Sequence, residues 1–123
     1  MKTIIIDTNA LMAMDEFGLD IFSAIREACN FPYTLAVLSK TMEELQSIMN
    51  SQRLKYKKAA KLALEMIKKK KLTVIESKGD VDDDLVEYSQ KGYLILTQDH
   101  ELKKRLKKPY LTIRQKSKII ILE

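Results

Sequence analysis

Carboxylates stand shortly after apolar runs at two places in this chain. Asp7 follows a run of three isoleucines, and Asp99 follows the run 93–96 after Thr97 and Gln98. A continuous apolar run is typical of a parallel strand that is covered on both faces. In open α/β sheets, ligands bind outside the carboxyl ends of the strands. We therefore expect both acids to face one crevice, where they could bind a divalent cation.

A third group of acids, Asp82-Asp83-Asp84, opens a stretch with helical periodicity. The helix dipole favours an acid in a first turn, but three neighbouring carboxylates repel one another unless cations offset them. Successive helical side chains point about 100° apart, so helical geometry does not choose among the three.

The fourth candidate acid lies in the pair Glu43-Glu44. Helical geometry places Glu44 at the edge of an apolar stripe and Glu43 on the polar side, so Glu44 is better placed to turn inward. The stripe consists of Leu38, Met42, Leu45 and Met49.

Converging carboxylates without histidine or cysteine ligands suit hard cations, Mg²⁺ or Mn²⁺. These ions clamp phosphate oxygens and lower the pKa of a bound water so that it can attack. No other group offers a nucleophile with a positioned base. We expect His100 to be a solvated surface residue and Cys29 to be a buried thiol.

Alternating strands and helices are expected to position these acids. Strands are predicted at residues 2–7, 33–38, 72–75, 93–96, 110–113 and 118–122. Helices are predicted at 9–14 as a short turn, 17–29, 40–50 with Ser39 as cap, 53–70, 81–91 and 101–106. The alternation predicts an α/β fold, a three-layer α/β/α sandwich with a mainly parallel central sheet. Residues 1–123 are expected to form one domain.

The distribution of charge predicts a polyanionic partner. Nine basic residues lie within 53–71 and eight within 103–118, whereas eight acids lie within 76–101. Basic segments around an acidic centre suit a nucleic acid, although lysine-rich and glutamate-rich surfaces also occur as solvated surfaces of hyperthermophilic proteins. The candidate RNA-binding residues are Arg53, Lys57, Lys61, Lys104, Arg105 and Arg114.

Cysteine usage and hydropathy bear on the compartment. The single Cys29 excludes an intramolecular disulfide and a cysteine-based zinc site. No apolar run approaches the length of a membrane span, and no signal peptide is visible. We therefore expect a cytoplasmic protein with no membrane partner.

In their order and spacing, these motifs resemble those of the PIN-domain family over nearly the whole chain. They are the strand ending in Asp7-Thr8-Asn9, the pair Glu44-Leu45, the acidic helix start at Asp82-Asp83, and Thr97-Gln98-Asp99. The stretches 17–22 and 113–116 look like small archaeal members, which are similar to the PIN nucleases that process ribosomal RNA precursors. Asp84 departs from the pattern, because the family's site acid is usually followed by a small or apolar residue.

The resemblance implies an endoribonuclease that depends on Mg²⁺ or Mn²⁺ and leaves 5′-phosphate and 3′-hydroxyl ends. It implies that the metal site is lined by Asp7, Glu44, Asp83 and Asp99, with Asp82 as the alternative to Asp83. Thr8, Asn9 and Thr97 match polar positions that support these acids.

Other functions fit parts of the sequence. A toxin-type ribonuclease would have an antitoxin as partner, and a non-catalytic RNA-binding module would act in a pre-ribosomal particle without turnover. A phosphotransfer domain with an aspartyl nucleophile needs a second acid two residues after the first, where this chain has Asn9. The RNA substrate, the number of metal ions and the formation of a homodimer stay open.

Overall fold

A computed structural model describes residues 1–51 and 53–123, and it places the strands of this part in one six-stranded sheet. The strand order is β3-β2-β1-β4-β5-β6. Neighbouring strands are parallel except for β6, which is antiparallel to β5. The predicted mainly parallel sheet is confirmed. The strands are β1 Lys2–Ile6, β2 Tyr33–Leu38, β3 Thr73–Ile75, β4 Leu94–Leu96, β5 Tyr110–Arg114 and β6 Lys118–Leu122.

β1 lies in the interior of the sheet and contributes to hydrophobic cores on both faces. Ile4 and Ile6 pack into one core and Ile5 packs into the other, and all three are completely buried. Strand side chains alternate between the two faces of a sheet. An unbroken run of isoleucines is therefore what a strand covered on both sides requires.

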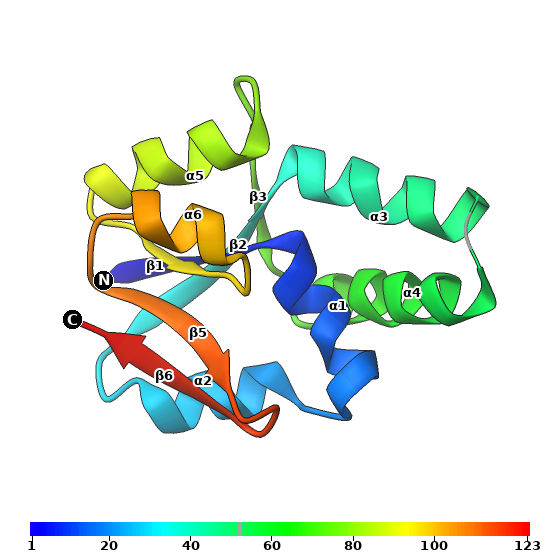
Figure 1. Cartoon of the computed structure of the whole chain (residues 1–123), viewed down its shortest axis with the longest axis horizontal. Helices are drawn as coiled ribbons and strands as arrows, with labels where there is room; N and C mark the ends of the chain where they lie inside the picture. The colour runs from blue at the N-terminus through cyan, green and yellow to red at the C-terminus, as the bar shows by residue number, and fades with distance from the viewer. Residues whose placement is uncertain (52) are drawn as a thin grey trace.

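Helices cover both faces of this sheet, which confirms the three-layer α/β/α architecture (Figure 1). α1, α2, α4 and one side of α3 pack into the larger core, and α5 and α6 pack into the smaller one. α3 and α4 lie side by side and extend beyond the sheet. The helices are α1 Thr8–Phe17, α2 Ile21–Ala28, α3 Ser39–Ser51, α4 Leu54–Lys69, α5 Val81–Gln90 and α6 His100–Arg105.

The first helical region differs from the sequence prediction. α1 is a full helix of 10 residues rather than a short turn, and the helix predicted at 17–29 begins only at Ile21. Gly18 ends α1 in the left-handed conformation, with a φ of 62°, which glycine adopts without steric cost. Asp20 then caps α2 by accepting hydrogen bonds from two backbone N–H groups of its first turn.

The sheet changes its direction of growth between β1 and β4. From β1 the chain continues through β2 to β3 on one side, and then returns to build β4, β5 and β6 on the other. The carboxyl ends of β1 and β4 therefore form a topological switch point, where open α/β sheets bind ligands. A hydrogen bond of 2.9 Å from the Asp7 N–H to the Leu96 carbonyl oxygen extends the pairing of the two strands to this point.

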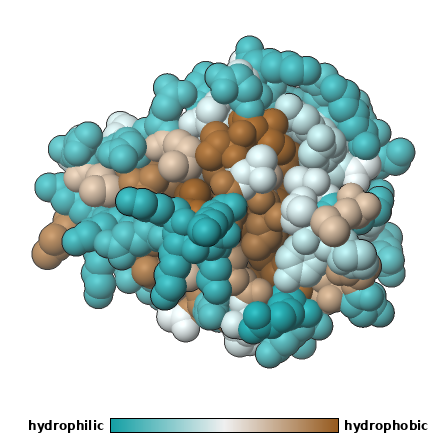
Figure 2. All heavy atoms as spheres, turned by 180° about the vertical axis from the view of Figure 1, so that it is seen from behind, coloured by the Kyte–Doolittle hydropathy of each residue, from teal (hydrophilic) through white to brown (hydrophobic). Residues whose placement is uncertain are grey.

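The face of the molecule opposite to the one seen in Figure 1 is mostly hydrophilic, but an apolar strip runs down it (Figure 2). Four large apolar side chains of the described residues are exposed, namely Met1, Leu54, Tyr56 and Val74. In residues 1–51 and 53–123, no helix is long and apolar enough to cross a membrane.

Candidate active site

Asp7 lies at the end of β1, caps α1, and is only 7% exposed. Its Oδ1 accepts the backbone N–H of Thr8 at 2.8 Å. Its Oδ2 accepts a hydrogen bond of 2.8 Å from the Thr97 hydroxyl and one of 3.3 Å from the Asn9 side-chain amide. Both oxygens are thus held by groups at the ends of β1 and β4, which fixes the orientation of the carboxylate.

Thr97 and Asn9 connect Asp7 to the segment that follows β4. The buried Thr97 hydroxyl donates to Asp7 and accepts the backbone N–H of Asp99 at 3.1 Å. The Asn9 Oδ1 accepts the backbone N–H of Gln98 at 3.0 Å. Asn9 therefore orients the carboxylate with its amide nitrogen and holds the turn that carries Asp99 with its amide oxygen.

Asp99 is half-buried and caps α6. Its Oδ1 accepts the backbone N–H groups of Glu101 at 2.9 Å and Leu102 at 3.1 Å. Within the part of the chain that the structure describes, the other oxygen has no hydrogen-bond partner. Asp99 thus starts α6 and is tied to Asp7 through Thr97.

Glu44 of α3 reaches the same end of the sheet through Thr8. The Thr8 Oγ1 lies 3.1 Å from the Glu44 Oε1 and 3.1 Å from the Thr41 Oγ1. A hydroxyl carries one proton, so when Thr8 donates to the carboxylate, Thr41 donates to Thr8. The structure brings Glu44 to this end of the sheet by a contact that Glu43 does not make.

Two of the three neighbouring aspartates of α5 have local partners. Asp84 is buried and accepts the backbone N–H groups of Lys78 at 2.9 Å and Gly79 at 3.3 Å, which fixes the loop before α5. Asp83 is exposed and forms an ion pair with Arg105 in which Oδ1 and the guanidinium nitrogen are 2.7 Å apart. To turn toward the other acids, either carboxylate would have to give up the partner described here.

Asp82 is the member of the trio that lies with the other acids. It is half-buried, and repulsion between like charges links it to both Asp99 and Asp7. The family resemblance selected Asp83, with Asp82 as the alternative. The structure places Asp82 nearer the cluster, because Asp83 is turned outward toward Arg105.

The environment of Asp7 opposes its ionisation. Burial is the main cause that raises the pKa of Asp7, and repulsion by Asp82 and Glu44 raises it further. The hydrogen bonds from Thr97 and from the Thr8 N–H lower the pKa of Asp7 and only partly offset the burial. The hydrogen bonds therefore hold the Asp7 carboxylate in position but do not fully offset its negative charge.

The environment of Asp82 also opposes its ionisation and raises its pKa. Burial raises the pKa of Asp82, repulsion by Asp99 and Asp80 adds to this, and attraction to Arg105 opposes it. The acids around the switch point thus carry more negative charge than the neighbouring hydrogen-bond donors offset. A bound cation would relieve this repulsion.

The set of donor atoms fits a hard divalent cation. The candidate ligands are all oxygens, which Mg²⁺ and Mn²⁺ prefer, and they come from Asp7, Glu44, Asp82 and Asp99. Among the described residues, no group of three or more acid, histidine or cysteine side chains lies close enough together to hold a metal ion. Mg²⁺ usually keeps several waters and binds through one or two carboxylates together with substrate phosphates, so an open arrangement suits it.

The candidate RNA-binding residues fall into three groups. Lys104 and Arg105 each pair with an acid, at 3.3 Å and 2.7 Å. Arg114 is exposed at the end of β5 and has no ion-pair partner within residues 1–51 and 53–123. The remaining three are exposed on or just before α4, which begins at the far end of the α3–α4 pair (Figure 1), namely Arg53, Lys57 and Lys61.

The sequence analysis missed Gln98 as a positioning residue. The Gln98 Oε1 accepts the Thr112 hydroxyl at 2.9 Å and the Ile113 backbone N–H at 2.7 Å. These bonds tie the turn that carries Asp99 to β5. The available signal was the place of Gln98 between two site residues at the carboxyl end of a predicted strand.

Ser77 was missed as well, and it joins the helix of Glu44 to the loop before Asp82. The Ser77 Oγ accepts the backbone N–H of Lys40 at 3.0 Å, and the Ser77 N–H donates to the Ser39 Oγ at 2.9 Å. The sequence predicted Ser39 as the cap of α3. The helix instead begins at Ser39, and Ser77 supplies the capping oxygen from a distant segment.

We expect Ser77→Ala to lower the free energy of unfolding by about 1 kcal/mol, the usual cost of removing a helix cap, because the Lys40 N–H loses its acceptor. Urea unfolding measures this change. Ser47→Ala, on an exposed face of the same helix, is the matched control and should not destabilise the protein. Equal unfolding curves for the two variants would show that the hydrogen bond from the Lys40 N–H to the Ser77 Oγ adds no stability.

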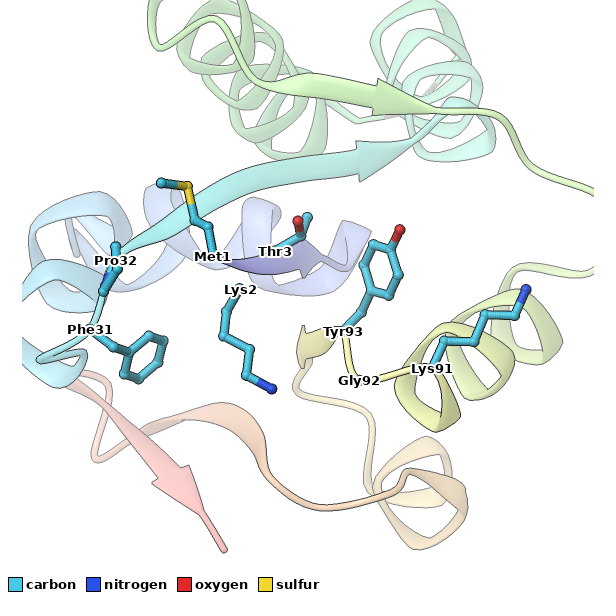
Figure 3. A pocket seen from close by; sticks show the side chains of 8 residues that line it. All are labelled: Met1, Lys2, Thr3, Phe31, Pro32, Lys91, Gly92 and Tyr93. Atoms are coloured by element: carbon cyan, nitrogen blue, oxygen red, sulfur yellow. The ribbon is translucent and has the colours of Figure 1, made fainter.

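A hollow of about 560 Å³ lies at the opposite, amino-terminal edge of the strands (Figure 3). No aspartate or glutamate lines it, so this hollow is separate from the acids of the candidate active site. Its lining residues are Met1, Lys2, Thr3, Phe31, Pro32, Lys91, Gly92 and Tyr93.

The fold and the site define an α/β domain with acidic side chains at the switch point of a mainly parallel sheet. Residues 4–116 match the PIN-like domain family. This match covers most of the chain, and the protein belongs to that family.

Two relatives of known name are similar over most of their length. Ribonuclease VapC4 of Methanocaldococcus jannaschii is 32% identical, and the match covers 94% of this chain and 93% of that protein. Ribonuclease VapC9 of Archaeoglobus fulgidus is 30% identical, and the match covers 87% of this chain and 77% of that protein.

Solved structures have the same fold. The PIN domain endonuclease Utp24 superposes with a TM-score of 0.75 at 23% identity, covering 97% of this chain and 90% of the other. The protein PAE2754 of Pyrobaculum aerophilum gives a TM-score of 0.58 at 20% identity, covering 86% and 81%. At these identities the likeness shows the fold alone.

Proposed function

We propose that this protein is a metal-dependent endoribonuclease that hydrolyses RNA phosphodiester bonds. The observation that carries the proposal is the buried Asp7 carboxylate at the switch point, oriented by Thr97 and Asn9 and repelled by Glu44 and Asp82. Burying an uncompensated charge is costly, so this arrangement fits ligand binding better than a purely structural role. The ribonuclease relatives support the same activity.

We assign the binding of the divalent ion, Mg²⁺ or Mn²⁺, to Asp7, Glu44, Asp82 and Asp99. When bound, the ion would acidify a water and offset the charge of the phosphate. The chain's own contribution is to hold the oxygens in place. Thr97 donates to Asp7, and Thr8 links the start of α1 to Glu44, so little reorganisation is needed when a phosphate arrives.

We propose precursor ribosomal RNA as the substrate, from the similarity of the motifs to small archaeal PIN proteins. A second candidate is a toxin-type ribonuclease controlled by an antitoxin, which the two relatives named VapC favour. An RNA substrate and a single unpaired cysteine both fit action in the cytoplasm. A neighbouring antitoxin gene whose product relieves growth arrest would identify the toxin, and unprocessed ribosomal RNA in a deletion strain would identify the processing enzyme.

Incubating the purified protein with single-stranded and structured RNA, with Mn²⁺ or with EDTA, tests the activity. We expect cleavage with Mn²⁺, none with EDTA, and products that carry 5′-phosphate and 3′-hydroxyl ends. Asp99→Asn should abolish cleavage, because asparagine lacks the negative charge. Asparagine still caps a helix, so the variant should fold. Glu101→Gln, two residues further along, should cleave normally. A non-catalytic RNA-binding module would instead bind these RNAs and cleave none of them.

A further inference from the structure

The side-chain amide of Gln98 has a fixed orientation. Its Oε1 accepts both the Thr112 hydroxyl and the Ile113 backbone N–H, and the second of these bonds is 2.7 Å long. A backbone N–H can only donate, so the oxygen end of the amide must face β5. The amide nitrogen therefore points away from β5.

This nitrogen carries two N–H donors that the protein does not use. Among the residues that the structure describes, every buried side-chain nitrogen or oxygen has a hydrogen-bond partner. The Gln98 nitrogen has no such partner there and is therefore accessible to solvent. Two oriented donors are thus presented beside Asp99, in a site otherwise dominated by acids.

Two cations near this end of the sheet interact electrostatically with each other, Lys103 and Arg114, and Lys103 also interacts with Asp99. Arg114 directly follows Ile113, whose N–H holds the Gln98 amide. Lys103 lies one turn into α6, and its backbone N–H donates to the Asp99 carbonyl oxygen. Lys103 is half-buried, whereas the next residue, Lys104, is exposed.

Among the described residues, neither of these two cations is in an ion pair, whereas Lys104 and Arg105 both are. Burial lowers the pKa of Lys103, and repulsion by Arg114 lowers it further, while Asp99 opposes this. A ligand that offsets both charges would have to be an anion.

We propose that Gln98, Lys103 and Arg114 form a subsite for the RNA phosphate next to the one that is cleaved. A phosphate offers several acceptor oxygens and a negative charge, which match two amide N–H groups and two unpaired cations. The proposal rests on the proposed ribonuclease function and specifies how that site grips its substrate. These contacts reach the backbone and not the bases, so they position RNA without reading its sequence.

The test measures binding separately from cleavage. Lys103→Gln and Arg114→Gln are introduced into a cleavage-deficient Asp7→Asn background, and binding of a fluorescein-labelled single-stranded RNA of mixed sequence is followed by anisotropy. Each should raise the Kd about tenfold, as expected for one hydrogen bond to a charged group. Each should also reduce the slope of log Kd against log salt concentration by about 0.7. Lys2→Gln makes the same change on an exposed lysine at the opposite, amino-terminal edge of the strands, and it should alter neither quantity.

Gln98→Glu tests the amide directly. Glutamate keeps an oxygen for Thr112 and Ile113 but replaces the donors with a second oxygen, so the thermal unfolding temperature should hold while RNA binding weakens. In the active enzyme, Lys103→Gln should raise KM and leave kcat unchanged, which is the signature of lost ground-state binding.

Binding by the Lys103 and Arg114 variants that equals that of Lys2→Gln would overturn the subsite, whatever Gln98→Glu does. That result would leave wild-type cleavage intact and the ribonuclease function standing. Failure of the wild type to cleave any RNA with Mn²⁺ would instead reject the proposed function, and the binding data would still report on the subsite.

Discussion

Asp7→Asn should reduce the rate of RNA cleavage by more than about 100-fold and leave the fold intact. Replacing a group that only orients a metal ligand costs about 10- to 100-fold in affinity or activity. Asp7 is itself the proposed ligand that Thr97 and Asn9 orient, so its replacement should cost more. Asparagine keeps the shape and the capping role of aspartate, so the loss would come from the missing charge. Steady-state kinetics on labelled RNA with Mn²⁺ measure the effect.

The matched control for this substitution is Asp15→Asn. Asp15 lies on the same helix, α1, two turns beyond Asp7, and its replacement makes the same change in net charge. It should leave the rate unchanged. A near-normal rate for Asp7→Asn would remove Asp7 from the metal site and with it the main support for the proposed mechanism.

The same substitution should change the dependence of stability on pH. Burial raises the pKa of Asp7, so the folded chain holds the Asp7 proton more tightly than the unfolded chain does. The resulting stabilisation is complete below the ordinary pKa of the carboxyl group and is lost as the pH rises through the raised pKa of the folded state. In metal-free buffer, the free energy of unfolding of the wild type should therefore fall relative to that of Asp7→Asn as the pH rises from the ordinary carboxyl pKa through the raised pKa of Asp7. Denaturant unfolding at a series of pH values measures the difference, and parallel curves would contradict it.

Asp82→Asn should lower the cleavage rate about 10- to 100-fold, whereas Asp83→Asn should lower it little. Asp82 is half-buried and interacts with Asp7 and Asp99, but Asp83 is exposed and paired with Arg105. Exposed ion pairs contribute little to stability, so both variants should fold. Kinetics with Mn²⁺ measure the rates.

Each of these two variants is the control for the other, because they make the same change one residue apart. Binding of Mn²⁺ to the folded state raises the melting temperature, and this increase should be smaller for Asp82→Asn than for Asp83→Asn. The opposite order in both measurements would return the role to Asp83, as the family resemblance implied.

The sheet could be predicted from the sequence because its strands depend on hydropathy. The isoleucines before Asp7 had to be buried on both faces, and the apolar run before Thr97 gave the second strand end. Parallel strands place their carboxyl ends at one edge. The convergence of Asp7 and Asp99 therefore followed from local signals.

The division of roles within Asp82-Asp83-Asp84 could not be predicted in this way. Asp83 and Asp84 are each held by a partner outside their own helix, Asp83 by Arg105 and Asp84 by backbone N–H groups of the preceding loop. The same is true of Gln98, whose partners lie on β5. Helical periodicity gives the direction of a side chain but not what it will meet there.

The helix predicted at 17–29 was wrong for a different reason. The apolar periodicity runs through the break, so the pattern alone favoured one helix. Gly18 and Asp20 carried the contrary signal, a left-handed end followed by a cap. A helix end at Gly18 and a helix cap two residues later, at Asp20, outweigh a continuous apolar pattern.

The hydrogen bond between Thr97 and Asp7 joins residues 90 positions apart, and this separation affects when the candidate site can assemble. During synthesis, β1 leaves the ribosome long before β4 and β5 exist, and long-range contacts of this kind are slow to form. Until Thr97 and the β5 partners of Gln98 have been made, Asp7 has neither its orienting hydroxyl nor its neighbouring acid. The candidate active site can therefore assemble only after β4 and β5 have been synthesised.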